Sequence, residues 1–311
     1  MIALSEYAAP RSPTRRLLAA GFGQARRTPR CPDTPRLDGR LAMVTGATGG
    51  IGFEIARGLA RRGAELILPC RNPAKGAALT DALRADGSTA QPHLVPMNLE
   101  DLESVRAGAR SIAALAAGRR IDLLVENAGI WPTRYARTRQ GHEIAFGVNV
   151  LAHFALRRRL EQEGLLAGAR VVALTGDIYI LESTCTPDSI WSGRSGGMRA
   201  YCRSKLGNLW IAAELLRRSP RLTVYVVHPG VVATNLGGDA GALGNRLKRL
   251  VMIGPELGAQ MPLVCCTQEG LANGAYYHNA LGRMRLDARD PALDSRAAAR
   301  LWETCEALAA K

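Results

Sequence analysis

Residues 41–52 of the chain read LAMVTGATGGIG, which predicts a strand, a tight turn and the start of a helix. The apolar run Leu41–Val44 has the length of a buried strand, and Ile51, Ile55 and Leu59 follow at helical spacing. Glycines in the turn let backbone N–H groups approach a phosphate, and the helix N-terminus favours negative charge. The stretch therefore predicts a phosphate-binding turn, although similar turns also occur without a ligand.

Apolar strands alternate with helical segments from this turn to the end of the chain. Further strands are expected at 65–70, 93–97, 121–125, 170–174, 223–227 and 275–277. Helices are expected at 74–84, 103–117, 143–163, 199–218, 255–269 and 294–308. Nearly continuous apolar strands indicate a parallel sheet covered on both faces. We therefore expect residues 38–311 to form one α/β domain, a Rossmann-like doubly wound parallel sheet with ligands at the carboxyl ends of its strands.

Residues 1–37 differ from the rest in composition. Five prolines fall in this segment, and residues 1–40 hold eight arginines against three acids, a net of 8 − 3 = +5. We expect a basic, Pro/Arg-rich N-terminal extension that is loosely attached. The apolar stretch after Arg15-Arg16 ends at Gly23 and is followed by Arg26-Arg27, which argues against an export signal. Contact of this segment with a membrane surface stays open as an alternative.

The overall composition narrows the class of protein. A hydrophobic content of 47% with 22% charged residues is that of a soluble globular chain. Seven scattered cysteines without a CxxC pair favour reduced thiols and a cytoplasmic location, and five dispersed histidines favour no metal site. The formal charge of +14 is spread over helices without interleaved aromatic residues, so we expect no nucleic-acid partner.

Five motifs occur in the order found in one known family. They are TGATGGIG at 45–52, NAG at 127–129, Asn149, YxxxK at 201–205 and PG at 229–230. From about Leu37 to Leu308 the chain thereby resembles the short-chain dehydrogenase/reductase family. It is most similar to the retinol-dehydrogenase-type members, through CRNPAKG (70–76), GVNVLAHFAL (147–156), AYCRSKLGNLW (200–210), VHPGVVATNL (227–236) and LWETCEAL (301–308).

Tyr201 and Lys205 are the expected catalytic pair. Four residues apart on a predicted helix, their side chains share a face. A nearby ammonium favours the phenolate, so we expect it to lower the tyrosine pKa from about 10 and make Tyr201 an acid or base. The resemblance implies that Lys205 also holds the nicotinamide ribose, and that Asn149 supports a water linking this lysine to solvent.

The end of the second strand bears on the choice of cofactor. It reads Cys70-Arg71-Asn72, without the carboxylate that usually binds the ribose hydroxyls of NAD. An arginine there can pair with a 2′-phosphate, which favours NADP(H) over NAD(H), unless Arg71 is only solvated. The resemblance implies further cofactor contacts from Thr45, Gly46, Thr48, Gly50, Ile51, Gly52, Asn98, Leu99, Asn127, Ala128, Gly129, Tyr201, Lys205, Pro229, Gly230, Val232 and Thr234.

One position departs from the family pattern. Members have a serine after the fifth strand that hydrogen-bonds the substrate oxygen, and here Gly176 stands in its place, with Thr175 before it. Losing such a donor costs about 10²–10³ in rate. Thr175 is the tentative replacement, and Asp177, Ser183 and Thr184 stay as other candidates.

The expected function follows from these residues and the resemblance. It is an NADP(H)-dependent oxidoreductase that interconverts an apolar carbonyl and its alcohol by hydride transfer, with Tyr201 as acid/base. The alternative is a catalytically weak, cofactor-binding sensor or partner protein, because of Gly176. An apolar substrate is expected because the loops 176–197 and 235–254 carry Ile178, Tyr179, Ile180, Leu181, Ile190, Trp191, Leu243, Leu250 and Val251. The resemblance also implies a homo-oligomer.

Overall fold

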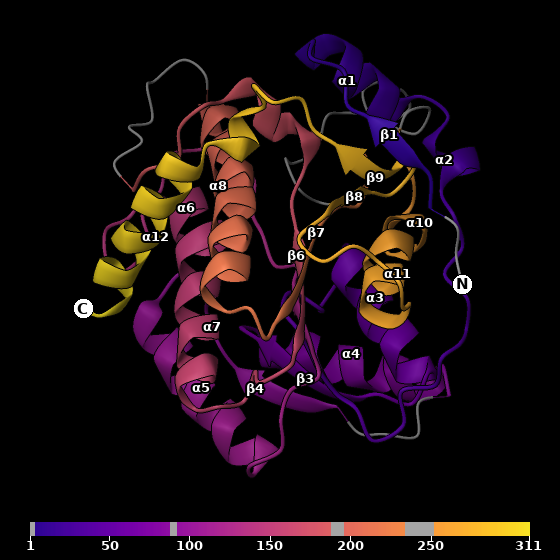
Figure 1. Cartoon of the computed structure of the whole chain (residues 1–311). Coiled ribbons are helices and arrows are strands. Elements are labelled where there is room, and N and C mark those ends of the chain that lie inside the picture. Colours follow the sequence, from indigo (N-terminus) through magenta and orange to yellow (C-terminus); the bar gives the residue numbers. More distant parts are fainter. Residues whose placement is uncertain (1–3, 88–91, 188–195, 234–251) are drawn as a thin grey trace.

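The computed structural model describes residues 4–87, 92–187, 196–233 and 252–311. Its centre is a nine-stranded sheet in which every neighbouring pair is parallel except β8 with β9 (Figure 1). In spatial order the strands are β1 (Glu6–Ala8), β9 (Gly282–Arg285), β8 (Tyr276–His278), β7 (Thr223–His228), β6 (Arg170–Leu174), β5 (Leu123–Glu126), β2 (Leu41–Val44), β3 (Glu65–Cys70) and β4 (His93–Pro96).

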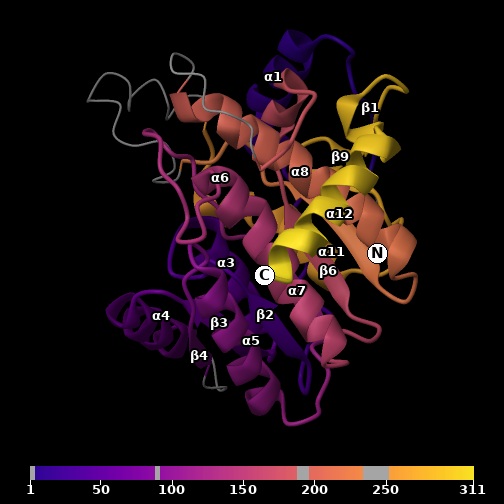
Figure 2. The ribbon, with the colours of Figure 1, turned by 90° about the vertical axis from the view of Figure 1, so that its left-hand side faces the viewer.

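Helices cover both faces of the sheet, as expected for a doubly wound fold. Leu41 and Met43 of β2 belong to one hydrophobic cluster and Ala42 and Val44 to the other, because successive side chains of a strand point to opposite faces. The first cluster is covered by α5 (Leu102–Ala116), α7 (Ala152–Gln162), α8 (Gly196–Arg218) and α12 (Ser295–Ala309), which face the viewer in Figure 2. Residues of α3 (Gly50–Arg61), α4 (Pro73–Ala85) and α11 (Gln260–Thr267) cover the second cluster.

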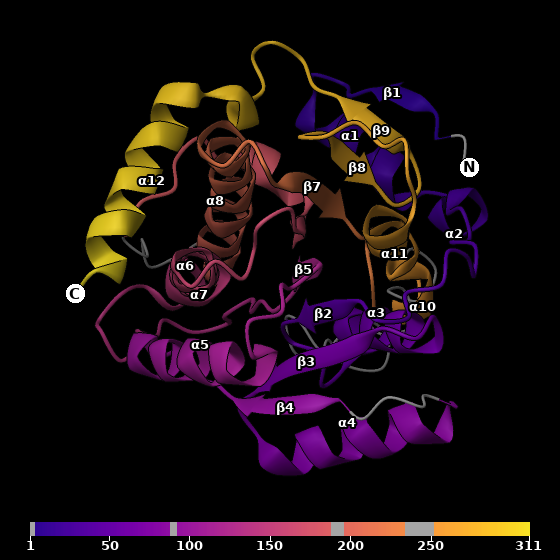
Figure 3. The same ribbon diagram turned by 60° about the horizontal axis from the view of Figure 1, so that its bottom comes forward.

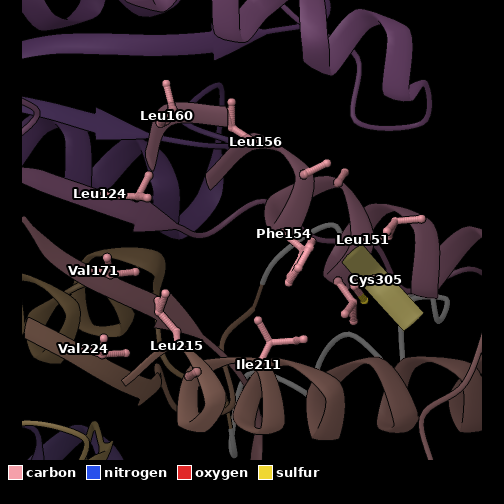
Figure 4. Close-up of a cluster of buried hydrophobic side chains, with 14 of the residues drawn as sticks. Leu124, Leu151, Phe154, Leu156, Leu160, Val171, Ile211, Leu215, Val224 and Cys305 are labelled. Atoms are coloured by element: carbon pink, nitrogen blue, oxygen red, sulfur yellow. The ribbon is translucent and has the colours of Figure 1, made fainter. Parts of the chain in front are cut away.

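Figure 4 shows how the first cluster joins sheet and helices. Leu124, Val171 and Val224 project from three neighbouring strands toward apolar side chains of α7 and α8, among them Phe154 and Leu215. These side chains are at most 5% exposed. Burial of this apolar surface holds the helices on the sheet.

Two predicted helices are divided in the structure. The segment expected as one helix at 143–163 consists of α6 (Ile144–Phe146), a π-helical turn η1 (Gly147–Leu151) and α7. A Cβ on Gly147 would come within 2.2 Å of Thr138 Cγ2, so the close approach requires glycine. The segment expected at 255–269 is divided into α10 (Pro255–Gly258) and α11.

The N-terminal segment is part of the fold, so the expectation of a loosely attached extension is wrong for its described residues. Strand β1 pairs in parallel with β9, Glu6 opposite Arg283, as Figure 3 shows at the edge of the sheet. After it, α1 (Pro13–Gly21) packs on the 3₁₀ turn η2 (Asp177–Leu181), and α2 (Gln24–Arg27) follows. The sequence could not show this, because strand partners 277 residues apart leave no local pattern.

Arg16 of α1 explains why this segment is bound firmly. Its side chain is 1% exposed, and its guanidinium donates to Asp290 Oδ2 at 2.6 Å, to Asp177 Oδ1 at 3.1 Å and to the Tyr179 hydroxyl at 2.8 Å. A buried charge is tolerated only when opposite charges and hydrogen bonds surround it. Arg16 is therefore an interior residue, although its neighbours made it look like surface charge.

No helix among the described residues is long and apolar enough to cross a lipid bilayer. All seven cysteines are free thiols, and five of them are buried.

Replacing Arg16 tests the attachment of the N-terminal segment. We expect Arg16→Met to lower the free energy of unfolding by about 3–5 kcal/mol, because Asp177 and Asp290 stay buried without their counter-charge. Arg15→Met, at an exposed position of the same helix, should change it by less than about 0.5 kcal/mol. Urea denaturation measures both values, and equal small losses would contradict a buried ion-pair role for Arg16.

Candidate active site

The turn between β2 and α3 has the geometry that its glycines allow. Gly46 and Gly50 have positive φ angles of 68° and 57°. A Cβ on Gly46 would come within 2.8 Å of Ala128 Cα, and one on Gly52 within 2.3 Å of the Gly46 carbonyl oxygen. The turn therefore packs directly on the end of β5 while the N-terminus of α3 faces an open cavity.

This cavity, of about 590 Å³, runs along the carboxyl ends of the strands. Of the predicted site residues, its lining contains Thr45, Gly46, Thr48, Gly50, Ile51, Gly52, Arg71, Asn98, Leu99, Asn127, Ala128, Gly129, Thr175, Tyr201, Lys205 and Pro229. Asn149, Gly230 and Val232 are not part of the lining, and Thr234 lies outside the described residues. Lining residues that the sequence reasoning missed include Lys75, Glu100 and Trp131.

The hydroxyl of Thr45 joins two strands at the floor of the cavity. It lies 3.0 Å from His153 Nε2 and accepts the backbone N–H groups of Asn127 and Ala128, each at 3.0 Å. The Asn127 side chain donates back to the Thr45 carbonyl at 2.9 Å. These two residues thus hold β2 and β5 together below the glycine turn, and their polar groups are largely committed to the protein.

At one end of the cavity, Arg71 is ion-paired with Glu100. The Arg71 side chain is 64% exposed, and the exposed Lys75 lies on the same wall. Asn98 accepts the Glu100 backbone N–H through Oδ1 at 3.2 Å. This end therefore offers two cations to an anionic group, with one carboxylate competing for Arg71.

At the other end, Tyr201 and Lys205 share a face of α8. Lys205 Nζ donates to the Leu174 carbonyl at 3.3 Å and lies 5.4 Å from the centroid of the Tyr201 ring. The indole of Trp131 stacks on Tyr201 with ring centroids 5.0 Å apart and 2° between the planes. The tyrosine ring is thereby fixed between an aromatic cover and a buried amine.

The electrostatics of this pair differ from the expectation. Burial lowers the pKa of Lys205 to about 8, so the amine is mostly protonated at neutral pH but loses its proton more easily than an exposed lysine. Burial raises the pKa of the Tyr201 phenol instead of the lysine lowering it. The expected direction for Tyr201 is therefore wrong for the protein alone, because burial of the phenol is the largest influence on its pKa.

Asn149 acts through its neighbours. It lies in the π-helical turn η1, where its Oδ1 accepts the Ile130 N–H at 2.8 Å and its Nδ2 donates to the Ile130 carbonyl at 2.9 Å. The same Nδ2 lies 2.9 Å from Ser204 Oγ on α8. Asn149 thus locks the segment after Gly129 to the helix that carries Tyr201 and Lys205.

The polar side chains directly after β6, at positions 175 and 177, are already hydrogen-bonded within the protein, so neither replaces the missing serine. Thr175, the tentative candidate, is 3% exposed and donates its hydroxyl to the Lys205 carbonyl at 2.8 Å. Asp177 is bound to Arg16 and to the Tyr276 hydroxyl, the latter at 2.5 Å. Ser183 and Thr184 are exposed.

The backbone at Gly176 leaves room for a side chain. Its φ of −159° is an extended conformation that any residue adopts. A Cβ at this position would lie 3.8 Å from Ile178 Cγ2 and 3.9 Å from His228 Nδ1, which are ordinary contacts. Neither backbone conformation nor contact within the described residues therefore forces a glycine here.

The fold also brings Asp177, His228 and His278 together, with one ligand-type atom of each within 4.8 Å of the others. The sequence could not show this, because the three lie on separate strands and turns. Nδ1 of His278 accepts the Ala280 N–H at 3.0 Å, so in the neutral ring Nε2 carries the proton. The Nε2 atom lies 3.7 Å from Asp177 Oδ2, too far for a hydrogen bond. With its proton on Nε2, His278 offers no free lone pair there to a metal.

Comparison with known sequences gives consistent matches. A family model described as short chain dehydrogenase matches residues 40–242. Retinol dehydrogenase 12 of Mus musculus is 35% identical over 286 residues and covers 89% of each chain. Retinol dehydrogenase 13 of Homo sapiens is 32% identical and covers 88% of this chain and 85% of its own.

Solved structures agree in fold. A protein from Mycobacterium paratuberculosis matches with a TM-score of 0.71 and 30% identity, covering 94% of this chain and 98% of that one. A short chain dehydrogenase from Burkholderia cenocepacia, solved in complex with NADP, matches with a TM-score of 0.63 and 26% identity. It covers 80% of this chain and 99% of that one.

The lowered pKa of Lys205 has a consequence for stability. Between pH 8 and 10.5 the unfolded lysine is protonated and the folded one is neutral, so stability rises with pH in this window. We expect wild type to gain up to about 3 kcal/mol relative to Lys205→Met across that range. Unfolding free energies of both proteins at several pH values measure this difference, and a flat or falling difference would contradict it.

Proposed function

The chain belongs to the short-chain dehydrogenase/reductase family and is a dehydrogenase/reductase acting on CH–OH groups, and from this premise we propose its specific reaction. It is an NADP(H)-dependent interconversion of an apolar carbonyl and its alcohol, with Tyr201 as acid/base. The observation that carries the proposal is one cavity with the glycine turn and Arg71 at one end and Tyr201 and Lys205 at the other.

The residues fit a dinucleotide phosphate. Gly49, Gly50 and Ile51 line the cavity at the N-terminus of α3, and a helix N-terminus favours an anionic group. Arg71 and Lys75 on one wall of the cavity are cations that would pair with a 2′-phosphate, which supports the proposal. A short chain dehydrogenase of similar fold was solved with NADP, which supports NADP(H) over NAD(H). When bound, the cofactor supplies or accepts the hydride.

The protein supplies the proton and holds the reacting groups in position. In reduction, the Tyr201 phenol donates its proton to the carbonyl oxygen and becomes the phenolate, and in oxidation the phenolate takes a proton from the alcohol. Burial keeps the phenol protonated until it reacts, which suits the acid role. The Lys205 amine, 5.4 Å from the centroid of the Tyr201 ring, stabilises the phenolate that forms. Asn149 joins Ile130 of the cavity wall to Ser204 of α8.

The substrate is apolar in this proposal. Ile130, Trp131, Val148 and Leu174 give the Tyr201 end apolar walls. The names of the relatives indicate an apolar alcohol, retinol, as their substrate. Tyr179, expected among the substrate loops, is instead fully buried beside Arg16, and Ile190, Trp191, Leu243, Leu250 and Val251 lie outside the described residues.

A second function stays a candidate because of one observation. Gly176 supplies no donor, and the Thr175 hydroxyl is bound to the Lys205 carbonyl. A protein that binds NADP(H) tightly but turns over slowly could serve as a sensor or partner. Turnover measured beside binding separates this candidate from the proposed enzyme.

We propose three further properties: membrane contact, location and oligomeric state. Leu18 and Phe22 near the end of α1 are 51% and 66% exposed beside arginines, which supports contact of this helix with a membrane surface. The free cysteines support a reducing, cytoplasmic location, and the resemblance supports a homo-oligomer.

The role of Tyr201 is tested with NADPH and a panel of apolar aldehydes and ketones. We expect Tyr201→Phe to lower kcat by about 10²–10⁴ while the Kd for NADPH changes less than about threefold, because only the proton donor is lost. Tyr135→Phe, at an exposed tyrosine, is the control. Full turnover in Tyr201→Phe would remove the mechanism, and NADPH binding without turnover in wild type would favour the sensor.

Cofactor preference is tested at the other end of the cavity. Arg71→Ala should weaken NADPH binding by about tenfold or more and leave NADH binding nearly unchanged. Glu100→Gln should strengthen NADPH binding by about two- to fivefold, because Arg71 is released from its competing carboxylate. Fluorescence titration measures both, with Arg84→Ala as a control of equal charge change, and equal losses for NADH and NADPH would contradict the preference.

A further inference from the structure

Two buried side chains of the N-terminal segment each bind the residue that directly follows an active-site turn. Arg16 binds Asp177, next to Gly176, and Gln24 binds Val231, next to Pro229-Gly230. Figure 3 shows α1 and α2 on the side of the sheet formed by β8 and β9. The second contact is the more specific, because it involves backbone groups beside the cavity.

The carboxamide of Gln24 matches the backbone of Val231. Its Nε2 donates to the Val231 carbonyl at 3.1 Å, and its Oε1 accepts the Val231 N–H at 3.0 Å. The Gln24 residue is 2% exposed. A buried carboxamide that pairs with both polar groups of one residue fixes that residue in position and orientation, and losing it would leave the Val231 N–H without this acceptor.

The preceding turn is shaped for this contact. Gly230 has a φ of 91°, and a Cβ there would come within 2.7 Å of Gln24 Oε1. Pro229 lines the cavity directly before it. The position of Gln24 therefore affects Pro229 on the cavity wall through the backbone of Val231 and Gly230. The residue at 230 must be glycine.

The same short segment is tied to a second chain segment. Ile253 N–H donates to the Val231 carbonyl and Ala233 N–H to the Ile253 carbonyl, both at 2.9 Å. The Val231 carbonyl thus accepts from both Gln24 and Ile253. Gln24 supports the point where residues 231–233 and 253 meet.

Gln24 itself is held by the carboxyl-terminal part of the fold. The Thr28 hydroxyl donates to the Gln24 carbonyl at 2.8 Å, and Asn279 Nδ2 donates to Thr28 Oγ1 at 3.1 Å. Asn279 follows β8 and is fully buried. The helix α2 is therefore anchored to the sheet, which makes its side chain a rigid support.

We propose that Gln24 is a positioning residue that sets the Pro229–Val231 turn against the nicotinamide end of the cofactor. This inference rests on the proposed NADP(H) function. The family resemblance implies that the turn at 229–230 contacts the nicotinamide. The contact from Gln24 comes from the N-terminal segment, which precedes β2, the first strand of the cofactor site. Gln24 acts through the backbone and touches neither substrate nor cofactor.

The test compares two ligands that share the adenosine end. NADPH reaches both ends of the cavity, whereas adenosine 2′,5′-bisphosphate carries only the phosphorylated adenosine. Gln24→Met, similar in length but without polar groups, should raise the Kd for NADPH about tenfold and change that for adenosine 2′,5′-bisphosphate less than about twofold. Gln24→Glu keeps an acceptor for the Val231 N–H but opposes its carbonyl, and should lie between wild type and Gln24→Met for NADPH.

The control is Arg26→Ala, an exposed position on the same helix, which should leave both values unchanged. If Gln24→Met does not fold, the two Kd values of Gln24→Glu test the proposal alone. Unchanged NADPH binding in the folded variants, or an equal loss for both ligands, overturns the positioning role. Failure of wild type to bind NADPH would instead remove the proposed function itself, so the two failures are distinguishable.

Discussion

The parallel alignment of the central strands is the constraint on which the site depends. Parallel neighbours end at the same edge of a sheet, so the residues that follow β2, β5, β6 and β7 meet there. Thr45, Asn127, Thr175 and Pro229 are those residues or lie within one position of them, and all four line one cavity. Side chains from positions up to 184 residues apart are thereby assembled without any local sequence signal linking them.

Local pattern explains what the sequence could predict. The apolar runs at 66–70 and 171–174 lie within β3 and β6, because buried parallel strands need no polar alternation. The glycine turn was predictable because positive φ angles and close packing leave few other residues for Gly46 and Gly52. The resemblance then supplied the order of the remaining motifs, and it led to the family that the comparisons identify.

Burial and distant contacts explain what the sequence could not predict. Arg16 stands among prolines and arginines typical of an exposed arm, and its carboxylate partners lie 161 and 274 residues away. The direction of the Tyr201 pKa was wrong because spacing shows a neighbouring lysine but not the loss of water around both groups. Glu126 at the end of β5 forms an ion pair of 2.5 Å with the buried Arg157, and this pairing also requires the fold.

The pairing of β1 with β9 imposes an order on folding. Residues 6–8 are synthesised long before their strand partner, which is completed only at residue 285. Until then the ion pair between Arg16 and Asp290 and the hydrogen bond between Asn279 and Thr28 cannot form. The N-terminal segment therefore lacks these contacts while the central sheet assembles. Because the entropy of closing a loop is lost before a non-local contact forms, this edge pairing is expected late in folding.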